Sequence, residues 1–296
     1  MIVPFDIYYS DENHLDRIYH KGQDKIWDGI EVLDDLFEKF PNEKLNLDTS
    51  HAAALENILS IILWGEYVAW TTSSEMSARF DDFGAKMAAV SQAHDEARHF
   101  YVIRDYLRRR HNFKPKAIFK PALRVLEEVD KTKDLAKKLL GLQLMVEPVA
   151  ITIFRFLRKS NVDPILTQVL PLFEKDEARH IALGVKYLPT LIKKMSLIEK
   201  GFFVIWQIRL ILHEVKGLKC IEKDLKALGI SPREVFEFAE NKQIACLKEL
   251  SSEFGIGEKI WRPVISIIEF KKGLTFYPHK DHSLARRVIN CFFESL

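Results

Sequence analysis

Hydrophobic positions along this chain recur at the spacing of amphipathic helices, and no segment of useful length alternates with the period of a strand. Residues 51–80 are typical of one long helix, with Thr49 or Ser50 as its N-cap. Residues 85–111 predict a second helix, and the sequence DDFG at 81–84 is a turn signal between them. The pattern therefore predicts an antiparallel pair of helices in this part of the chain.

A second helical pair is predicted further along the chain. Residues 134–159 are helical in pattern, and the sequence SNVDP at 160–164 ends that helix. Asp163 then caps the next helix and Pro164 occupies its first position. Beyond residue 195 four more segments have a helical pattern, namely 196–218, 231–254, 258–270 and 283–294. The sequence therefore predicts an all-α protein.

We expect a single domain over residues 1–296. The first 48 residues mix charged and aromatic side chains without clear periodicity, so we interpret 1–48 as a packed lead-in. The helical core is expected over 49–193 and further helices that pack on it over 194–296. A chain of this length is long enough to bury a substantial core.

Composition narrows the classes of partner and compartment. The net charge is only +2, so nothing in the total suggests a nucleic-acid partner. The most apolar stretches are too short for a bilayer and carry charges, so we expect no membrane span. Cys220, Cys246 and Cys291 have no pairing or metal-binding spacing, which fits a reducing compartment. We therefore expect a cytoplasmic protein.

The pentapeptide DEARH occurs twice, at 95–99 and at 176–180. The repeat extends further, because Glu66 stands thirty residues before Glu96 and Glu147 stands thirty residues before Glu177. The two lone glutamates fall in strongly apolar helical stretches, where an unpaired carboxylate costs several kcal/mol. The same set of two glutamates and one histidine therefore occurs twice with the same spacing, which indicates that the two sets have a common function.

The turn signals indicate how these residues meet. The midpoint of each Glu to Glu interval falls in a turn, at residue 81 or residue 162. In an antiparallel pair, each lone glutamate then faces its own Glu-x-x-His at the same height, about 22 Å from the turn. Glutamate and histidine three residues apart share a helix face. Two such hairpins bring together four carboxylates and two imidazoles, from Glu66, Glu96, His99, Glu147, Glu177 and His180.

This set suits two divalent metal ions, and oxygen with nitrogen ligands but no thiolate favours iron or manganese. The motifs resemble the ferritin-like di-iron carboxylate superfamily in its duplicated E…DExRH form. Bacterial multicomponent monooxygenase hydroxylases share that form, p-aminobenzoate N-oxygenases share it loosely, and the ribonucleotide reductase small subunit and ligand-binding oxidases have a similar layout. The resemblance covers about 50–193. It implies a ferritin-like four-helix bundle core with additional N- and C-terminal helices.

The resemblance also implies roles for individual residues. One iron is expected at Glu66, Glu96 and His99, the other at Glu147, Glu177 and His180, with some glutamates bridging. In the monooxygenases the aspartate before the second glutamate accepts a hydrogen bond from a ligand histidine. Asp95 and Asp176 hold that place here, and Arg98 and Arg179 would pair with them. Ordinary surface salt bridges are the alternative for these four residues.

Several neighbours of the motifs have two interpretations each. Glu174 lies one turn before Glu177 and is either a further ligand or proton relay, or an ordinary paired glutamate. Trp70, Leu144 and Ile151 either wall the metal chamber or belong to the general core.

Two further positions bear on the chemistry. We expect Phe173 to line the pocket. It stands where N-oxygenases carry an extra histidine, and the absence of that histidine weakens the hypothesis of N-oxygenation. Pro148 directly follows Glu147, and we expect a π-bulge there that changes the direction of the Glu147 side chain. The alternative is a structural kink, which is compatible with a π-bulge.

The resulting hypothesis is a dioxygen-activating oxidoreductase, of the monooxygenase or N-oxygenase type, with two iron ions (or one manganese and one iron). Dioxygen is its co-substrate and a small apolar or aromatic organic molecule its substrate. Electrons would come from a reductase or ferredoxin, and the apolar segment 201–212 is compatible with a homodimer. The alternatives are a ligand-binding or radical-forming oxidase, a non-enzymatic iron-binding or ferroxidase protein, and salt-bridged helices without metal.

Overall fold

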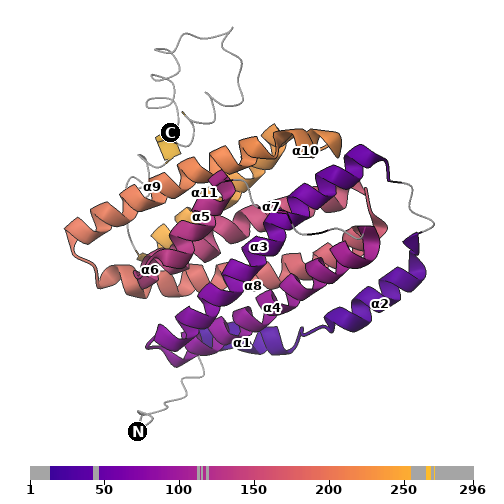
Figure 1. Cartoon of the computed structure of the whole chain (residues 1–296). Coiled ribbons are helices and arrows are strands. Elements are labelled where there is room, and N and C mark those ends of the chain that lie inside the picture. The colour runs from indigo at the N-terminus through magenta and orange to yellow at the C-terminus, as the bar shows by residue number, and fades with distance from the viewer. Residues whose placement is uncertain are drawn as a thin grey trace.

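The computed structural model describes residues 14–42, 47–111, 114, 116–117, 120–254, 265–267 and 270. All regular secondary structure within these residues is helical (Figure 1), which confirms the predicted all-α class. The elements are α1 (His14–Gln23), α2 (Gly29–Lys39), α3 (Thr49–Arg79), α4 (Phe83–His111), α5 (Lys120–Lys131), α6 (Leu135–Leu139), the π-helical η2 (Leu140–Val146), α7 (Glu147–Ser160), α8 (Pro164–Lys193), α9 (Leu197–Cys220), α10 (Glu222–Ala227) and α11 (Pro232–Phe254).

The first long hairpin is formed by α3 and α4, which pair along their lengths. Helix α3 ends at Arg79 and α4 begins at Phe83, so the turn lies where the DDFG signal predicted it. The N-cap of α3 is Asp48, one residue before the predicted positions. Its carboxylate accepts from the backbone N–H groups of Ser50 and His51, both at 2.8 Å, as capping carboxylates do.

The second hairpin joins α7 to α8 and packs beside the first through α4 and α8. Asn161 ends α7 in the left-handed region, with φ 51°. Asp163 caps α8 as predicted by accepting from the Ile165 N–H at 2.7 Å. The same buried carboxylate accepts from the Tyr106 hydroxyl and the Arg110 Nε, both at 2.8 Å, and so fixes this turn to the end of α4.

A π-helical segment interrupts the helix predicted over 134–159. In η2 the Glu147 N–H donates to the Leu142 carbonyl, five residues back, in place of an α-helical bond. Pro148 follows at the start of α7 and has no N–H to continue the α-helical ladder. The widened turn thus lies directly before Glu147, where the sequence placed either a π-bulge or a kink.

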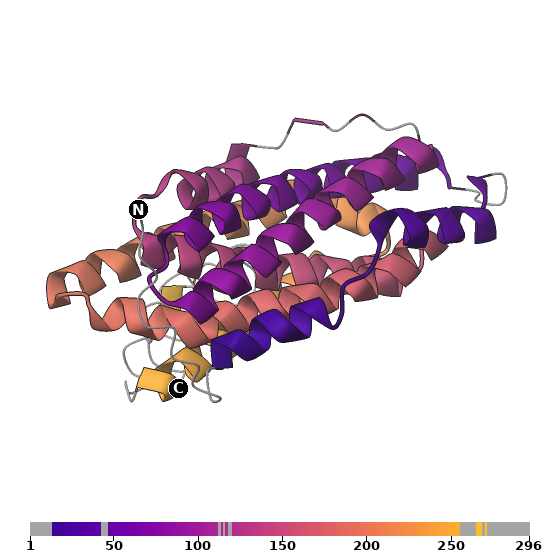
Figure 2. The same ribbon diagram turned by 90° about the horizontal axis from the view of Figure 1, so that it is seen from below.

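Other helices surround the two hairpins. Figure 2 shows α1 and α2, in indigo, along the outside of α4 and α8. Each of α1 and α2 contacts both α4 and α8. These two helices lie in the lead-in, where the sequence showed no clear period. Helix α5 lies between the two hairpins in the sequence, and it packs on α9 and α3. The predicted helix 283–294 and most of 258–270 lie outside the described residues.

The apolar core of the two hairpins is divided into two clusters. One contains Ala69 and Met76 of α3 and Leu183 and Leu188 of α8, toward the α3–α4 turn. The other contains residues on the far side of Glu66 and Glu177, such as Leu59, Leu63, Val169 and Leu170. The four glutamates at the centre of the repeats therefore lie in a layer between two apolar clusters.

Two helical stretches, Thr49–Arg79 and Leu135–Ser160, are long and apolar enough to cross a membrane by length and composition alone. Half of the first and 72% of the second hydrophobic window are buried inside the protein. Packing in the helical core accounts for their apolar character, because core helices of soluble proteins have the same composition.

Candidate dinuclear metal centre

The two hairpins bring the six repeat residues into contact at the centre of the bundle. All are buried, and the most exposed, Glu66, is only 4% accessible. Their ligand atoms form two groups, in each of which all atoms lie within 4.8 Å of one another. One group comprises Glu66, Glu96, His99 and Glu177, and the other comprises Glu96, Glu147, Glu177 and His180. Glu96 and Glu177 belong to both groups, so these two carboxylates are placed to bridge two ions.

The two histidine rings present the same nitrogen to the carboxylates. His180 Nδ1 lies 2.8 Å from Glu177 Oε2 and 3.0 Å from Glu96 Oε1. His99 Nδ1 lies 3.1 Å from Glu177 Oε1 and 3.5 Å from an oxygen of each of Glu66 and Glu96. Each Nδ1 therefore points to the middle of a set of carboxylate oxygens.

The other ring nitrogens are held crosswise between the two repeats. His99 Nε2 lies 3.1 Å from Asp176 Oδ2, and His180 Nε2 lies 3.2 Å from Asp95 Oδ2. The aspartate of each motif thus orients the histidine of the other motif. An Nε2–H that donates to a carboxylate leaves the Nδ1 lone pair free to bind a metal, and it fixes the plane of the ring.

Two arginines neutralise the aspartates, and each contacts both of them. Arg98 lies 2.6 Å from Asp95 and 2.9 Å from Asp176, while Arg179 lies 2.9 Å from Asp95 and 2.7 Å from Asp176. Burial raises the pKa of Asp176, but His99 and Arg179 outweigh it and hold that pKa below its usual range. The network is buried, so the alternative of ordinary surface salt bridges is wrong.

Buried polar atoms without a partner mark where cations fit. Among the described residues, Glu96 Oε2, Glu177 Oε1 and His99 Nδ1 have no hydrogen-bond partner. Burial and the neighbouring carboxylates raise the pKa of Glu66 and of Glu147 well above the usual range. Four glutamates with neutral imidazoles carry four negative charges, which two divalent ions balance. The oxygen and nitrogen donors without thiolate suit iron or manganese.

Two buried glutamines, which the sequence analysis missed, hydrogen bond to the ligand set. Gln92 Nε2 donates to Glu96 Oε1 at 3.1 Å and to Glu147 Oε1 at 3.0 Å. Gln143 Nε2 donates to Gln92 Oε1 at 2.8 Å. Each glutamine stands four residues before a repeat glutamate, so polar residues on the ligand face of apolar helices were the available signal.

The lead-in contributes a third residue whose role was not predicted. Trp27, in the segment before α2, donates its Nε1–H to Asp176 Oδ2 at 2.9 Å. The Arg98 guanidinium lies 4.6 Å from the centre of its ring, and the Phe173 ring centre lies 5.8 Å from it. A single tryptophan in a segment without periodicity gave no signal for this role.

The remaining predicted residues occupy different surroundings. Phe173 stacks on the His99 ring, with centroids 4.0 Å apart and planes 18° apart. Glu174 pairs with Arg158 at 3.1 Å and is in neither metal-binding group, so the paired interpretation holds.

Trp70 does not wall the chamber, because it is 38% exposed and packs against Tyr67 and Phe100. Residues three and four positions beyond Glu66 lie on opposite sides of its direction, and helix packing places Ala69 at the cavity and turns Trp70 outward. Leu144 and Ile151 are buried in the general core. Neither is among the described residues that line the cavity beside the centre.

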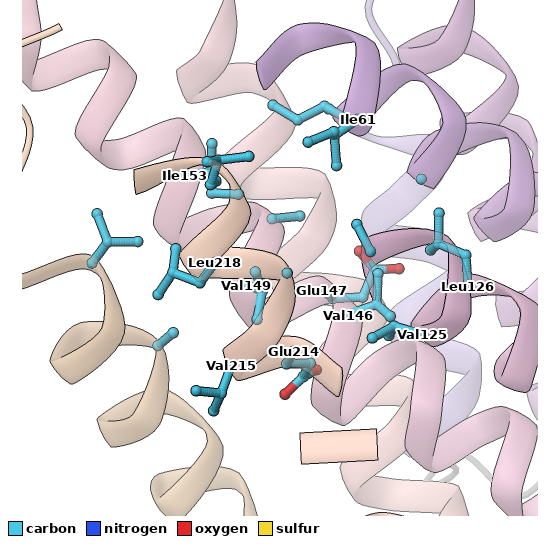
Figure 3. Close-up of a pocket in the computed structure, with 18 of the residues that line it drawn as sticks. Ile61, Val125, Leu126, Val146, Glu147, Val149, Ile153, Glu214, Val215 and Leu218 are labelled. Atoms are coloured by element: carbon cyan, nitrogen blue, oxygen red, sulfur yellow. The ribbon is translucent and has the colours of Figure 1, made fainter. Parts of the chain in front are cut away.

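A cavity of about 160 Å³ opens beside the centre. Glu66 of α3 and Glu147 of α7 contribute to its wall, and the rest is mostly aliphatic (Figure 3). Helices α5, α9 and α11 supply the other sides, so the helices outside the two hairpins complete the cavity. An organic molecule held there would contact the two glutamates directly.

Known structures share this architecture. An R2-like ligand-binding oxidase variant with an aerobically reconstituted Mn/Fe cofactor has a TM-score of 0.69 and 14% identity, over 83% of this chain and 99% of that chain. The chain has the ferritin-like fold. An R2-like ligand-binding oxidase from Sulfolobus acidocaldarius has a TM-score of 0.59 and 21% identity, over 82% of this chain and 92% of that chain.

A third structure is a protein with aldehyde deformylating oxidase activity from Synechococcus. Its TM-score is 0.61 with 14% identity, over 73% of this chain and 98% of that chain. No family model and no curated protein matches the sequence. The predicted ferritin-like helical bundle is confirmed by the shared fold, and the chemistry of the site rests on its own residues.

Proposed function

We propose that this protein is a dioxygen-activating oxidoreductase with a dinuclear iron or manganese–iron centre. The single observation that carries this proposal is the pair of buried ligand groups that share Glu96 and Glu177. Similar structures are described as oxidases, and one carries an Mn/Fe cofactor, which supports the same chemistry. Glu66, Glu96 and His99 would hold one ion, and Glu147, Glu177 and His180 the other.

When bound, two such ions supply the electrons that dioxygen needs for activation. The protein's own residues hold the geometry. Asp95 and Asp176 fix the two imidazole rings, and Gln92 holds Glu96 and Glu147 side by side. The two apolar clusters on either side keep water from the centre.

The aliphatic wall of the cavity favours a small organic substrate with a large apolar part. Oxidation of such a molecule in repeated cycles needs an external electron donor, and we propose a reductase or ferredoxin in a cytoplasmic setting. Conversion of the substrate by hydroxylation fits better than N-oxygenation, since Phe173 replaces the extra histidine that the N-oxygenases carry.

A second candidate is an oxidase that reacts once with a bound ligand or with its own side chains. The similarity to R2-like ligand-binding oxidases favours it. The two candidates differ in turnover: an oxygenase consumes dioxygen repeatedly with substrate and reductant, while a single-turnover oxidase stops after one equivalent per centre.

The test is to load the protein anaerobically with ferrous iron, remove unbound metal, and measure metal content and dioxygen consumption. We expect about two ions per chain and dioxygen uptake on exposure to air. Glu96→Ala should lose both properties, because Glu96 belongs to both ligand groups. Glu174→Ala is the matched control, since Glu174 lies one turn before the ligand Glu177 but pairs with Arg158 and is in neither ligand group. The proposal would be refuted if Glu96→Ala kept its metal, or if the parent bound no stoichiometric metal.

A further inference from the structure

The charged residues that line the cavity are all of one sign. Among the described lining residues the ionisable side chains are Glu66, Glu147, Glu214 and Glu240, and none is lysine, arginine or histidine. Glu66 and Glu147 belong to the proposed metal centre, where bound cations would balance their charge. Glu214 and Glu240 come from α9 and α11, outside both hairpins, and have no part in that centre.

Glu214 is placed like a binding residue rather than a structural one. Its Oε2 accepts from Gln243 Nε2 at 2.9 Å, while its Oε1 is buried without a hydrogen-bond partner among the described residues. Burial raises the pKa of Glu214 to about 8, since no cation lies beside it in the part of the chain described. A carboxyl with a free oxygen in an aliphatic wall is costly, and a leucine would pack there without that cost.

The same pair is linked to the metal centre. Gln243 Nε2 also lies 3.4 Å from the Met145 carbonyl, in the π-helical segment two residues before Glu147. Figure 3 shows Glu147 and Glu214 entering one cavity from separate helices, with Val146 and Val149 among the aliphatic side chains around them. A ligand in this cavity therefore has an aliphatic surface to contact, the metal-binding glutamates, and a separate acceptor at Glu214.

We propose that the cavity binds an amine with an apolar body, and that the free oxygen of Glu214 accepts a hydrogen bond from the amine nitrogen. Gln243 holds the other oxygen and so orients the carboxyl. This inference deepens the proposed function, on which it rests for the oxidation of the apolar part beside Glu66 and Glu147. The size fits, because an apolar cavity of about 150 Å³ is large enough for benzene.

Electrostatics selects the amine over other ligands of equal size. A carboxylate ligand would bury its negative charge in an aliphatic cavity, with no cation in the described cavity wall to pair with it. An ammonium group favours the ionised form of Glu214 and so displaces the proton that burial keeps on this carboxyl. An alcohol can share one hydrogen bond with Glu214 but gains no attraction between charges. The apolar contacts are the same for all three, so the preference among them reports on Glu214.

The test compares hexylamine, 1-hexanol and hexanoate by calorimetric titration of the metal-loaded protein. Hexylamine should bind about tenfold or more tightly than the other two. In Glu214→Gln that preference should disappear while 1-hexanol affinity stays within about threefold of the parent. Glu222→Gln is the matched control, because Glu222 follows α9 but pairs with Lys219 and Lys226 outside the cavity. It should keep the preference.

Two results would overturn the inference: equal or tighter binding of hexanoate or 1-hexanol by the parent, or unchanged amine affinity in Glu214→Gln. The ranking of the three ligands by the parent needs no variant, so it decides the question even if Glu214→Gln folds poorly. Metal content measured on the same samples separates the two proposals. Absent metal counts against the proposed function, whereas full metal without amine preference counts against Glu214 alone.

Discussion

The two proposed metal positions have the same ligand types by sequence, yet their surroundings differ. Beside Glu96 and Glu147, Gln92 and Gln143 form a chain of amide hydrogen bonds. The residues at the corresponding repeat positions, 81 residues away, are Phe173 for Gln92 and Ile62 for Gln143. Phe173 stacks on His99, and Ile62 lines the cavity.

This difference separates two roles within one repeat. Amide donors stabilise ionised carboxylates, so we expect the proposed position beside His180 to hold a metal more firmly than the other. The position beside His99 has an aromatic ring and an aliphatic cavity wall, which favour contact with an organic molecule. A duplicated motif thus specifies ligands equally, and the positions just before it specify what each half does.

The largest expected effect comes from the ligands that both positions share. Glu177→Ala should reduce bound metal from about two ions per chain to fewer than one, whereas His99→Ala and His180→Ala should each retain about one. The reason is that Glu177 belongs to both ligand groups and each histidine to one. Elemental analysis after anaerobic ferrous loading checks it. If all three variants retained the same amount of metal, the two positions would not share carboxylate ligands.

The arginines of the two motifs provide a comparison of stability. Arg98→Met should lower the free energy of unfolding by about 3–5 kcal/mol, because it leaves the buried Asp95 and Asp176 with half of their cationic partners. Arg179→Met should cost less, since Arg179 is more exposed and lacks the contact that Arg98 makes with Trp27. Urea unfolding of the metal-free proteins measures both. A larger loss for Arg179→Met would reverse this order.

Glu214 has no counterpart in the repeat, and its titration separates it from both halves. Its raised pKa means that between pH 4.5 and about 8 the folded protein holds a proton that the unfolded chain has lost. The stability of the parent relative to Glu214→Gln should therefore fall by several kcal/mol as pH rises through that range. Denaturation of the metal-loaded proteins at several pH values tests it. A constant difference would mean that Glu214 does not titrate there.

Removal of the amide donors tests the comparison directly. Gln92→Leu should weaken metal binding most at the position beside His180, by about 10- to 100-fold, because Glu147 belongs to that group alone and loses its hydrogen-bond donor. Phe173→Leu, at the same place in the other repeat, should leave that position unchanged. Competition with a chelator of known affinity resolves the two steps of metal release. Equal losses in both variants would show that the surroundings do not distinguish the positions.

The smallest effect is expected at Trp27. Trp27→Phe removes the hydrogen bond to Asp176 but keeps an aromatic ring next to Arg98, so stability should fall by about 1 kcal/mol. Urea unfolding measures it, and bound metal should be unchanged. A loss of metal from this variant would assign Trp27 a much greater part in orienting His99 through Asp176.

The sequence by itself determined the helical class, the two hairpins and the six residues that meet between them. It could do so because a helix has a fixed rise and period, so equal distances from a turn give equal heights. The turn at 81–84 and the cap at Asp163 have local causes and were predicted in place.

Only the tertiary structure decided the surroundings of those residues. The crosswise pairing of Asp95 with His180, the contact of Trp27 with Asp176, and the meeting of Glu214 with Gln243 join segments that no local period relates. Trp70 was misplaced because the rotation of a side chain about its helix depends on how neighbouring helices pack. Local periodicity fixes the height of a residue along a helix, and packing between helices decides which of its neighbours it meets.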